Sequence, residues 1–329
     1  MPDTKPTLLQ LLALPKVLPD AQQRLEKHYR CLKLWEADDP NQLMRDHGEE
    51  VEVLLTSAFH AARAALIDQL PNLKAICSLG VGYDSIDIGH AHARGIQVSN
   101  TPDVLNDCVA DLAWGLILST LRGMGQAERF VREGKWESQL ATLPLGRRVT
   151  GKRLGIVGLG RVGLAVAQRA AGFEMDLRYH NRRPRNDVAW TYESDLLVLA
   201  DWCDILVVAT VGGPETRHLI NRRVLESLGP EGVLINVARG SVVDEKALIE
   251  ALAHGTIAAA GLDVFESEPH VPEALKALDN VVLMPHIASA TLETRQAMVN
   301  LVVENAESYA RSGKVLTPVP QAVAIKKPG

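Results

Sequence analysis

The stretch Leu154-Gly155-Ile156-Val157-Gly158-Leu159-Gly160-Arg161-Val162-Gly163 decides the fold of this 329-residue chain. An apolar run typical of a buried strand leads into three glycines with the spacing G-x-G-x-x-G, and a helix-like segment follows. In such a unit Gly158 permits the tight turn, Gly160 lets a pyrophosphate approach the backbone, and Gly163 lets helix and strand pack closely. The amides at the helix start then bind the anion. The stretch therefore predicts a dinucleotide site, with a glycine-rich turn that binds no ligand as the alternative.

The segments on both sides of this motif alternate between strand-like and helix-like patterns. Downstream, apolar runs at 176–180, 205–209, 232–236 and 258–262 predict a parallel, doubly wound sheet. Upstream, the shorter apolar runs at 8–14, 51–55, 73–79 and 95–100 predict a smaller α/β domain. We also expect one long helix over about 105–134, a connector over 135–150, a helix over about 292–311 and a Pro-rich tail.

Length and composition exclude several classes of protein. A chain of 329 residues exceeds one ordinary core, so two domains are expected. The net charge of −5 disfavours a nucleic-acid partner, and no apolar run reaches the ~18 residues of a membrane span. Cys31, Cys77, Cys108 and Cys203 lack a metal-binding spacing, so we predict no metal site and reduced thiols in the cytoplasm.

A basic loop ends the second strand of the predicted dinucleotide domain. It reads Asn181-Arg182-Arg183-Pro184-Arg185, where NAD-binding proteins carry an acidic residue for the ribose 2′-hydroxyl. Arginines attract a 2′-phosphate, whereas a carboxylate repels it. We therefore predict that Asn181, Arg182 and Arg183 contact the cofactor, and that NADP(H) is preferred with NAD(H) as a second cofactor. A solvated basic loop is the alternative.

Three polar residues, Arg239, Glu268 and His286, each follow an apolar run. Ligands of open α/β sheets bind beyond the carboxyl ends of the strands, so we expect all three at the dinucleotide edge. Histidine can exchange a proton with a forming alkoxide, and a glutamate can orient its ring. Arginine can bind a carboxylate and polarise the adjacent carbonyl. The set predicts hydride and proton transfer at a carbonyl beside a carboxylate, with three ordinary surface residues as the alternative.

A second glycine-rich loop, Gly80-Val81-Gly82, follows the apolar run at 73–79. Its backbone N–H groups can form a small anion-binding nest. A plain turn at the end of a strand is the alternative for this loop.

Taken together, these motifs resemble the D-isomer-specific 2-hydroxyacid dehydrogenase family over nearly the whole chain. The arginine loop and Val211-Gly212-Gly213-Pro214 are most similar to the NADPH-preferring glyoxylate/hydroxypyruvate and hydroxyphenylpyruvate reductases. Besides the glycine motifs, the resemblance rests on Asn100-Thr101-Pro102, Pro214-Glu215-Thr216-Arg217, Asn236-Val237-Ala238-Arg239-Gly240, Gly261-Leu262-Asp263-Val264-Phe265 and Pro285-His286-Ile287-Ala288-Ser289-Ala290.

The resemblance implies an α/β fold with two Rossmann-like domains, doubly wound parallel sheets and an interdomain cleft. It implies a discontinuous substrate-binding domain, 1–99 plus 289–329, and a dinucleotide-binding domain, 100–288. It further implies a homodimer built mainly through the nucleotide domain, and no membrane partner is expected.

The resemblance also implies roles for individual residues. Arg239, Glu268 and His286 match the family's catalytic set, and the substrate carboxylate is assigned to Val81, Gly82 and Arg239. Cofactor contacts are implied for Gly158, Leu159, Gly160, Arg161, Val162, Asn181, Arg182, Arg183, Thr216, Val237, Ala238, Asp263 and Ser289, with Asp263 on the nicotinamide side. The chain departs from the family at Asp103 and Asn106, where Gly and Thr are common.

The predicted reaction is the NADPH-dependent reduction of a small 2-oxo acid, of the glyoxylate or hydroxypyruvate type, to the D-2-hydroxy acid. His286 is the expected proton donor. One alternative is an NAD-dependent dehydrogenase acting oxidatively, and another is a non-catalytic, cofactor-sensing binding protein. Leu55, Thr56 and Ser57 are expected to line the substrate pocket, and Trp136 to reach a partner's site.

Overall fold

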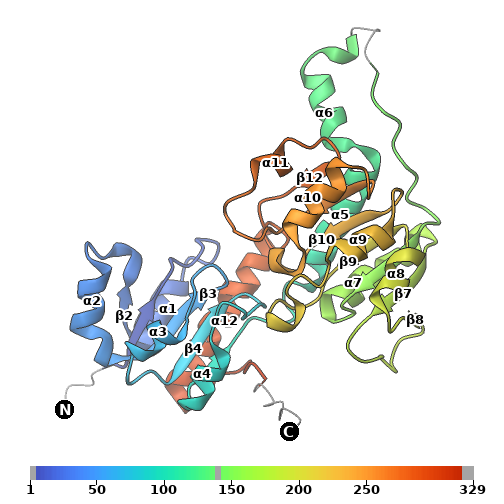
Figure 1. Ribbon diagram of the computed structural model, residues 1–329. Helices are drawn as coiled ribbons and strands as arrows, with labels where there is room; N and C mark the ends of the chain where they lie inside the picture. Colours follow the sequence, from blue (N-terminus) through green and yellow to red (C-terminus); the bar gives the residue numbers. More distant parts are fainter. Residues whose placement is uncertain (1–4, 138–141, 321–329) are drawn as a thin grey trace. The chain divides into compact units, whose positions relative to one another are not determined.

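The computed structural model describes residues 5–137 and 142–320, and it divides into two compact units (Figure 1). Unit 1 comprises Met1–Leu105 and Ala290–Gly329, and unit 2 comprises Asn106–Ser289. Part of the expected connector, 138–141, and the expected Pro-rich tail at 321–329 lie outside the described residues.

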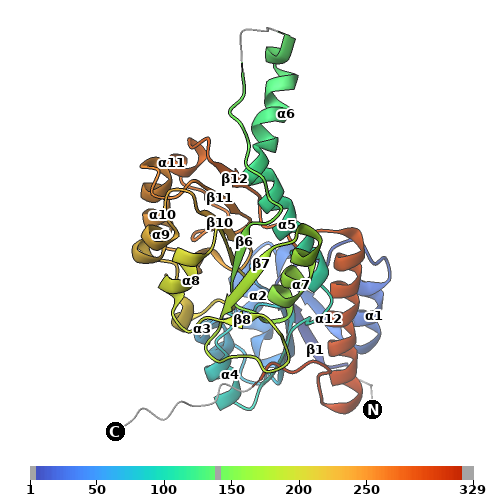
Figure 2. The same cartoon turned by 90° about the vertical axis from the view of Figure 1, so that its right-hand side faces the viewer.

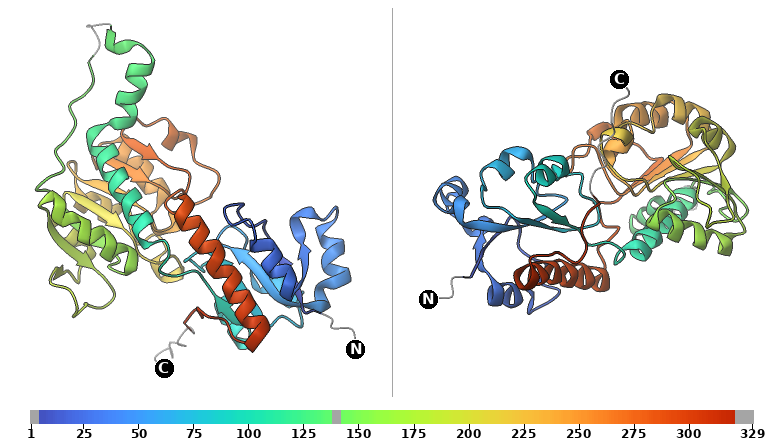
Figure 3. Two further views of the ribbon diagram at one scale, coloured as in Figure 1. Left: turned by 180° about the vertical axis from the view of Figure 1, so that it is seen from behind. Right: turned by 90° about the horizontal axis from the view of Figure 1, so that it is seen from below.

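Unit 1 is a five-stranded parallel sheet with the order β2-β1-β3-β4-β5. This is the flavodoxin-like order, in which the strand order reverses between β1 and β3. Helix α12, from the C-terminal part of the chain, packs against α1 and β4 (Figure 3). The strands are β1 (Thr7–Gln10), β2 (Arg30–Lys33), β3 (Val51–Ser57), β4 (Ala75–Leu79) and β5 (Gln97–Ser99); the helices are α1 (Ala21–His28), α2 (Pro40–His47), α3 (Ala64–Asp68), α4 (Ile88–Ala93) and α12 (Leu292–Ser312).

Unit 2 is a seven-stranded parallel sheet with the order β12-β11-β10-β9-β6-β7-β8 (Figure 2). Strand β6 carries the glycine motif and lies between β7 and β9, where the order reverses. The strands are β6 (Arg153–Val157), β7 (Asp176–His180), β8 (Thr191–Tyr192), β9 (Ile205–Val208), β10 (Val233–Asn236), β11 (Ala259–Leu262) and β12 (Val281–Leu283); the helices are α5 (Asn106–Arg122), α6 (Met124–Arg132), α7 (Arg161–Ala170), α8 (Leu196–Trp202), α9 (Arg222–Leu228), α10 (Glu245–Ala253) and α11 (Glu273–Lys276).

Helices pack against both faces of the unit 2 sheet, which explains its uninterrupted apolar strands. All four residues of β9 and of β10 are buried, as expected for parallel strands covered on both faces. Helices α8, α9 and α10 pack together, and their apolar residues join one core cluster with Leu206 and Leu234. Helices α5 and α7 pack together, and Trp114 of α5 stacks on Phe173 with ring centroids 4.4 Å apart. The predicted α/β class with two parallel sheets is confirmed.

Two expectations about secondary structure are wrong. The single helix over 105–134 is two helices, because Gly123 adopts a left-handed conformation with φ 60° and separates α5 from α6. The strand expected over 8–14 ends at Gln10. The structure also adds two strands that the sequence pattern did not indicate, β2 and β8, which lie at the outer edges of their sheets.

The unit boundaries lie at 105/106 and 289/290, whereas the sequence prediction placed them at 99/100 and 288/289. Asp103, next to the first boundary, has φ 68°. Glycine adopts this left-handed region readily and aspartate tolerates it. The backbone conformation therefore accounts for the glycine that the family often carries there.

Candidate active site

The glycine loop between β6 and α7 has the shape that a pyrophosphate requires. At Gly158, φ is 96° and a β-carbon would lie 2.6 Å from the backbone of Thr210, while at Gly163 it would lie 2.1 Å from the carbonyl oxygen of Gly158. Glycine is thus sterically required at both positions. A β-carbon at Gly160 would meet no atom within 4 Å, so the space above this residue is open. Arg161 begins the ten-residue helix α7, whose first amides adjoin that space. These residues fit a dinucleotide.

The basic loop after β7 is tied to the glycine loop by two hydrogen bonds. The Leu159 N–H donates to the Asn181 Oδ1 at 2.7 Å, and the Arg185 Nη1 donates to the Leu159 carbonyl oxygen at 2.9 Å. Arg182 forms an ion pair with Glu215 at 2.7 Å. Within the described part of the chain, Arg183 is exposed and forms no hydrogen bond or ion pair. Neither Arg185 nor Glu215 was among the predicted contacts. Arg185 belongs to the loop but bonds to the glycine loop, and Glu215 reaches Arg182 only through the fold.

His286 and Glu268 form a directly bonded pair. The His286 Nδ1 lies 2.7 Å from the Glu268 Oε2, and both side chains are about four-fifths buried, with 22% and 20% exposed. The other carboxylate oxygen, Oε1, accepts the Phe265 N–H at 2.9 Å. The carboxylate thus fixes the imidazole ring and leaves Nε2 on the opposite side of it.

Asp263 shapes the turn that presents His286. Its side chain is fully buried, and its two oxygens accept the N–H groups of Ile287 at 2.7 Å and Ala288 at 3.0 Å. Its carbonyl oxygen accepts the His286 N–H at 2.8 Å. These bonds hold His286 in a left-handed conformation, φ 54°, which costs energy for a non-glycine residue and is common at functional sites.

Arg239 lies in the loop after β10 and begins a short 3₁₀ helix over Gly240–Val242. Its Nη1 donates to the Ala238 carbonyl oxygen at 2.7 Å. A β-carbon at Gly240 would lie 1.8 Å from the carbonyl carbon of Phe265. The loop that carries Arg239 therefore packs directly on the segment whose N–H holds Glu268.

The two buried carboxylates differ in how their environments affect the pKa. Burial alone would raise the pKa of Glu268, but the bonds from His286 and Phe265 and the charge of Arg239 outweigh it and lower the pKa. For Asp263, burial dominates over the bonds from Ile287 and Ala288 and raises the pKa. Glu268 is thus kept ionised as a partner for a protonated imidazole.

The remaining residues predicted to contact the cofactor have side chains that are buried, half-buried or already bonded within the protein. The Thr216 hydroxyl donates to the Val211 carbonyl oxygen at 2.7 Å. The side chains of Val237 and Ala238 are buried, and Ser289, half-buried, ends unit 2.

In unit 1, the motif over Asn100–Thr101 supports the Gly80–Gly82 loop. The Asn100 Nδ2 donates to the Val81 carbonyl oxygen at 2.8 Å, and the Gly80 N–H donates to the Thr101 Oγ1 at 3.0 Å. The N–H groups of Val81 and Gly82 bond to no described residue. Two adjacent donors thus stand at the carboxyl end of β4.

The neighbouring strand end differs from what was expected. Leu55, Thr56 and Ser57 are all buried, and the hydroxyl of Thr56 already bonds to the His60 carbonyl oxygen. Phe59, two residues beyond the end of β3, has an exposed apolar side chain.

Within residues 5–137 and 142–320, no cluster of metal-ligating side chains is found, and no helix is long and apolar enough to cross a membrane. A cavity of about 610 Å³ lies in unit 2, lined by the end of α5, by α6 and by β12. None of the predicted site residues lines it.

Comparison with known proteins gives consistent results. A family model described as D-isomer specific 2-hydroxyacid dehydrogenase, NAD binding domain, matches residues 114–288. A glyoxylate/hydroxypyruvate reductase A of Arabidopsis thaliana is 46% identical over 91% of this chain and 95% of its own length. A hydroxyphenylpyruvate reductase of Plectranthus scutellarioides is 44% identical over 91% of this chain and 95% of its own length. The crystal structure of an NADPH-dependent glyoxylate/hydroxypyruvate reductase of Sinorhizobium meliloti, with NADP and malonate, has a TM-score of 0.90 and 43% identity, covering 97% of this chain and 98% of that one.

Proposed function

Because the chain belongs to the D-isomer specific 2-hydroxyacid dehydrogenase family of oxidoreductases, we propose that it reduces glyoxylate or hydroxypyruvate to the D-2-hydroxy acid with NADPH. The observation that carries the proposal is the His286–Glu268 pair, bonded at 2.7 Å beyond the carboxyl ends of parallel strands. The relatives that act on small 2-oxo acids support the choice of substrate.

In the proposed reaction, His286 delivers a proton to the oxygen of the substrate carbonyl. A bound nicotinamide supplies the hydride. Since Nδ1 is bonded to Glu268, Nε2 is the nitrogen that donates. Glu268, ionised and bonded on both oxygens, holds the ring in one orientation and stabilises its positive charge.

For the substrate carboxylate we propose the groups that the sequence indicated, Arg239 and the N–H groups of Val81 and Gly82. A guanidinium binds a carboxylate through two parallel hydrogen bonds and polarises a carbonyl beside it. Two adjacent backbone donors form a nest for an anion. Support comes from the two N–H groups, which bond to no described residue.

The preference for NADPH rests on the loop Asn181–Arg185. No carboxylate belongs to this loop, and two of its arginines, Arg182 and Arg183, have exposed side chains. The Sinorhizobium meliloti relative, which is NADPH-dependent and was crystallised with NADP, supports the same choice. Guanidinium groups bind a 2′-phosphate that the NADH ribose lacks.

Initial rates with both cofactors test the proposed function. We expect oxidation of NADPH in the presence of glyoxylate and of hydroxypyruvate, with kcat/KM at least about tenfold higher than with NADH, because one charge-assisted phosphate contact contributes roughly 1.4 kcal/mol or more. Absorbance at the nicotinamide band gives the rates, and chiral chromatography of the product tests for the D-isomer. A higher kcat/KM with NADH would refute the assignment of NADPH as the preferred cofactor. Cofactor binding without turnover of either substrate would favour a sensing role.

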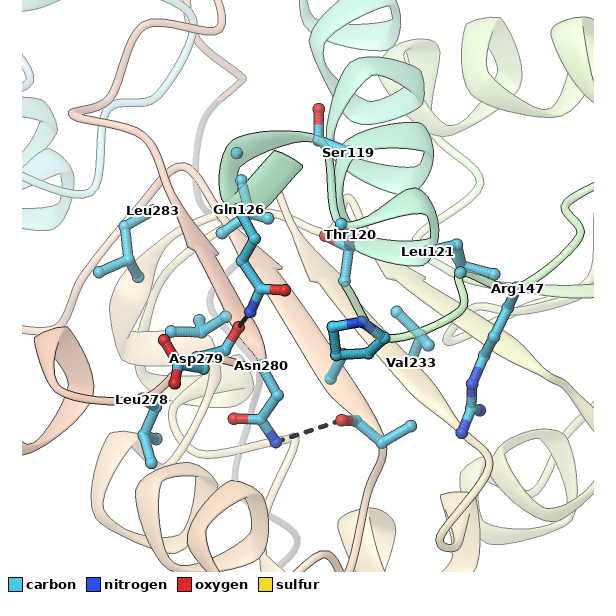
Figure 4. A pocket seen from close by; sticks show the side chains of 18 of the residues that line it. Ser119, Thr120, Leu121, Gln126, Arg147, Val233, Leu278, Asp279, Asn280 and Leu283 are labelled. Atoms are coloured by element: carbon cyan, nitrogen blue, oxygen red, sulfur yellow. Dashed lines mark hydrogen bonds between the residues drawn. The ribbon is translucent and has the colours of Figure 1, made fainter. Parts of the chain in front are cut away.

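We further propose a homodimer formed through α6 and the cavity beside it. Strand β12 is the outermost strand of its sheet, and exposed edges are commonly covered by a partner. Figure 4 shows Gln126 of α6 pointing to the carbonyl oxygen of Asp279, and Ser119 and Thr120 on α5, which also line the cavity. Exposed apolar side chains occur on α6 and on the segment after it: Met124, Val131, Trp136, Leu143 and Leu145.

The substitution Leu145→Glu tests the dimer. Leu145 is 98% exposed in the protomer, so a charge there should leave the fold intact and raise the dimer dissociation constant at least about tenfold, because burial of an unpaired charge is costly. Sedimentation equilibrium measures the constant. Leu316→Glu, at a leucine in unit 1 with 53% exposure, is the control and should leave it unchanged. A monomeric wild-type protein would refute the proposal.

A reducing, cytoplasmic location is also proposed. Among the described residues, Cys31, Cys77 and Cys203 form no disulfide, and burial raises the pKa of Cys31 and of Cys77 to about 11. Such groups are unreactive neutral thiols at physiological pH.

A further inference from the structure

We propose that Glu215 is a built-in competitor for the 2′-phosphate site: it pairs with Arg182 and thereby weakens the binding of 2′-phosphorylated dinucleotides. This inference rests on the proposed function, because it takes Arg182 as a 2′-phosphate ligand. Glu215 lies 33 positions from Arg182 in the sequence. In this proposal it sets the ratio of the affinities for NADP(H) and NAD(H).

The ion pair is direct and lies in solvent. The Arg182 Nη1 donates to the Glu215 Oε2 at 2.7 Å, and the side chains are 81% and 57% exposed. An exposed pair of this kind is weak and is screened by salt, so an incoming dianion can displace the carboxylate. The pair therefore tunes affinity without blocking the site.

Glu215 is presented by a turn that its own hydrogen bonds hold together. It lies in the 3₁₀ segment Pro214–Thr216, and the Thr216 hydroxyl donates to the carbonyl oxygens of Val211 at 2.7 Å and Gly213 at 3.3 Å. The Thr216 N–H also donates to the Gly213 oxygen. Because the turn is internally bonded, the carboxylate stays near the basic loop even when Arg182 turns to another anion.

The other two arginines of the loop are placed differently. Arg185 is bonded to Asp187, with Nε to Oδ1 at 2.9 Å, and to the Leu159 carbonyl oxygen, so it braces the glycine loop. Arg183 is exposed and bonds to no described side chain. We therefore assign the 2′-phosphate to Arg182 and Arg183. Of these two, only Arg182 must give up its bond to a carboxylate, that of Glu215, when the phosphate binds.

Two electrostatic effects act in the same direction when the phosphate binds. Arg182 loses its bond to Glu215, and the released carboxylate remains close to a group of the same charge sign. Both effects oppose NADP(H) and leave NAD(H), which lacks the 2′-phosphate, untouched. Removal of the charge at position 215 should therefore strengthen only 2′-phosphorylated ligands.

The experiment is equilibrium titration calorimetry of the full-length variant Glu215→Gln with NADP⁺, NAD⁺, 2′,5′-ADP and 5′-AMP. We expect the affinity for NADP⁺ and 2′,5′-ADP to rise about three- to tenfold at low salt, as one weak ion pair and one repulsion are removed. The affinity for NAD⁺ and 5′-AMP should change by less than about twofold. The gain should shrink at 0.5 M salt, where the Debye length is about 4 Å.

Asp187→Asn is the matched control, because it also removes one negative charge that is paired with an arginine of the same loop, Arg185. The variant Arg182→Ala and the double variant Arg182→Ala/Glu215→Gln complete a mutant cycle. In the Arg182→Ala background, loss of the Glu215 charge should raise NADP⁺ affinity less than it does in the wild type, because only the repulsion is then removed and not the competing ion pair.

The outcomes separate the inference from the proposed function. If Arg182→Ala leaves the NADP⁺ to NAD⁺ affinity ratio unchanged, the 2′-phosphate site itself is misassigned. If Arg182→Ala lowers the ratio but Glu215→Gln does not raise it, the competitor role is overturned while the cofactor assignment stands. Equal gains in Glu215→Gln and Asp187→Asn would show a general effect of net charge and would also overturn it.

Discussion

Replacement of His286 by alanine should lower kcat by about 10²- to 10⁴-fold, the usual contribution of a positioned general acid. The imidazole is bonded to Glu268 at 2.7 Å and held in place by the Asp263 hydrogen bonds, so the substitution removes a proton donor whose position the fold fixes. Binding of NADPH should remain within about threefold of the wild type, because the glycine loop lies on a different strand. Stopped-flow single turnover, together with fluorescence titration of NADPH, separates the two effects.

His218→Ala is a close control for this variant. His218 also has a left-handed backbone, φ 51°, and its Nε2 bonds to a glutamate, Glu266, at 2.8 Å. If a bonded histidine–glutamate pair mattered only for structure, both substitutions would have similar consequences. We expect His218→Ala to keep kcat within about fivefold, since only a partly exposed pair is lost. A kcat for His286→Ala in the range of this control would refute its role as proton donor.

The sequence indicated where the site lies because the geometry of a parallel sheet is regular. Each apolar run gave a strand, and the residue types beyond the runs pointed to the carboxyl edge. Arg239, Glu268 and His286 could be found this way, since each lies within a few residues of a strand or its following turn. The direct bond between His286 and Glu268 could not, because it depends on the turn that Asp263 holds through three hydrogen bonds.

Features that depend on distant residues or on sheet edges were not accessible from local patterns. Glu215 meets Arg182 across 33 positions, and no spacing rule connects the two. Strand β2 has side chains exposed or only partly buried, so it lacks the apolar run that marks a central strand. The sequence pattern does not indicate the break between α5 and α6, because a glycine inside a helical pattern is often tolerated.

The second large effect is expected for Gly240→Ala, a substitution that adds one methyl group next to Arg239, one of the proposed catalytic residues. A β-carbon there would lie 1.8 Å from the carbonyl carbon, 1.9 Å from the carbonyl oxygen of Phe265 and 2.3 Å from the nitrogen of Glu266. These are backbone atoms, which cannot rotate away, so the segment must move. We expect a loss of about 3 kcal/mol or more in the free energy of unfolding, measured by urea titration, as for severe overpacking.

The same shift should impair catalysis in the fraction that remains folded. The Phe265 N–H holds the Glu268 carboxylate, and Arg239 precedes Gly240, so the substitution should displace two members of the proposed catalytic set together. Since a displacement of about 1 Å can cost on the order of 10²-fold, kcat/KM per folded molecule should fall at least that much. Gly115→Ala in α5 is the control: its β-carbon meets no atom within 4 Å, and better helix propensity should stabilise it by up to about 1 kcal/mol. A Gly240→Ala protein with wild-type stability and kcat/KM would mean that the Phe265–Glu268 segment yields freely, and that its contact with the Arg239 loop does not position the site.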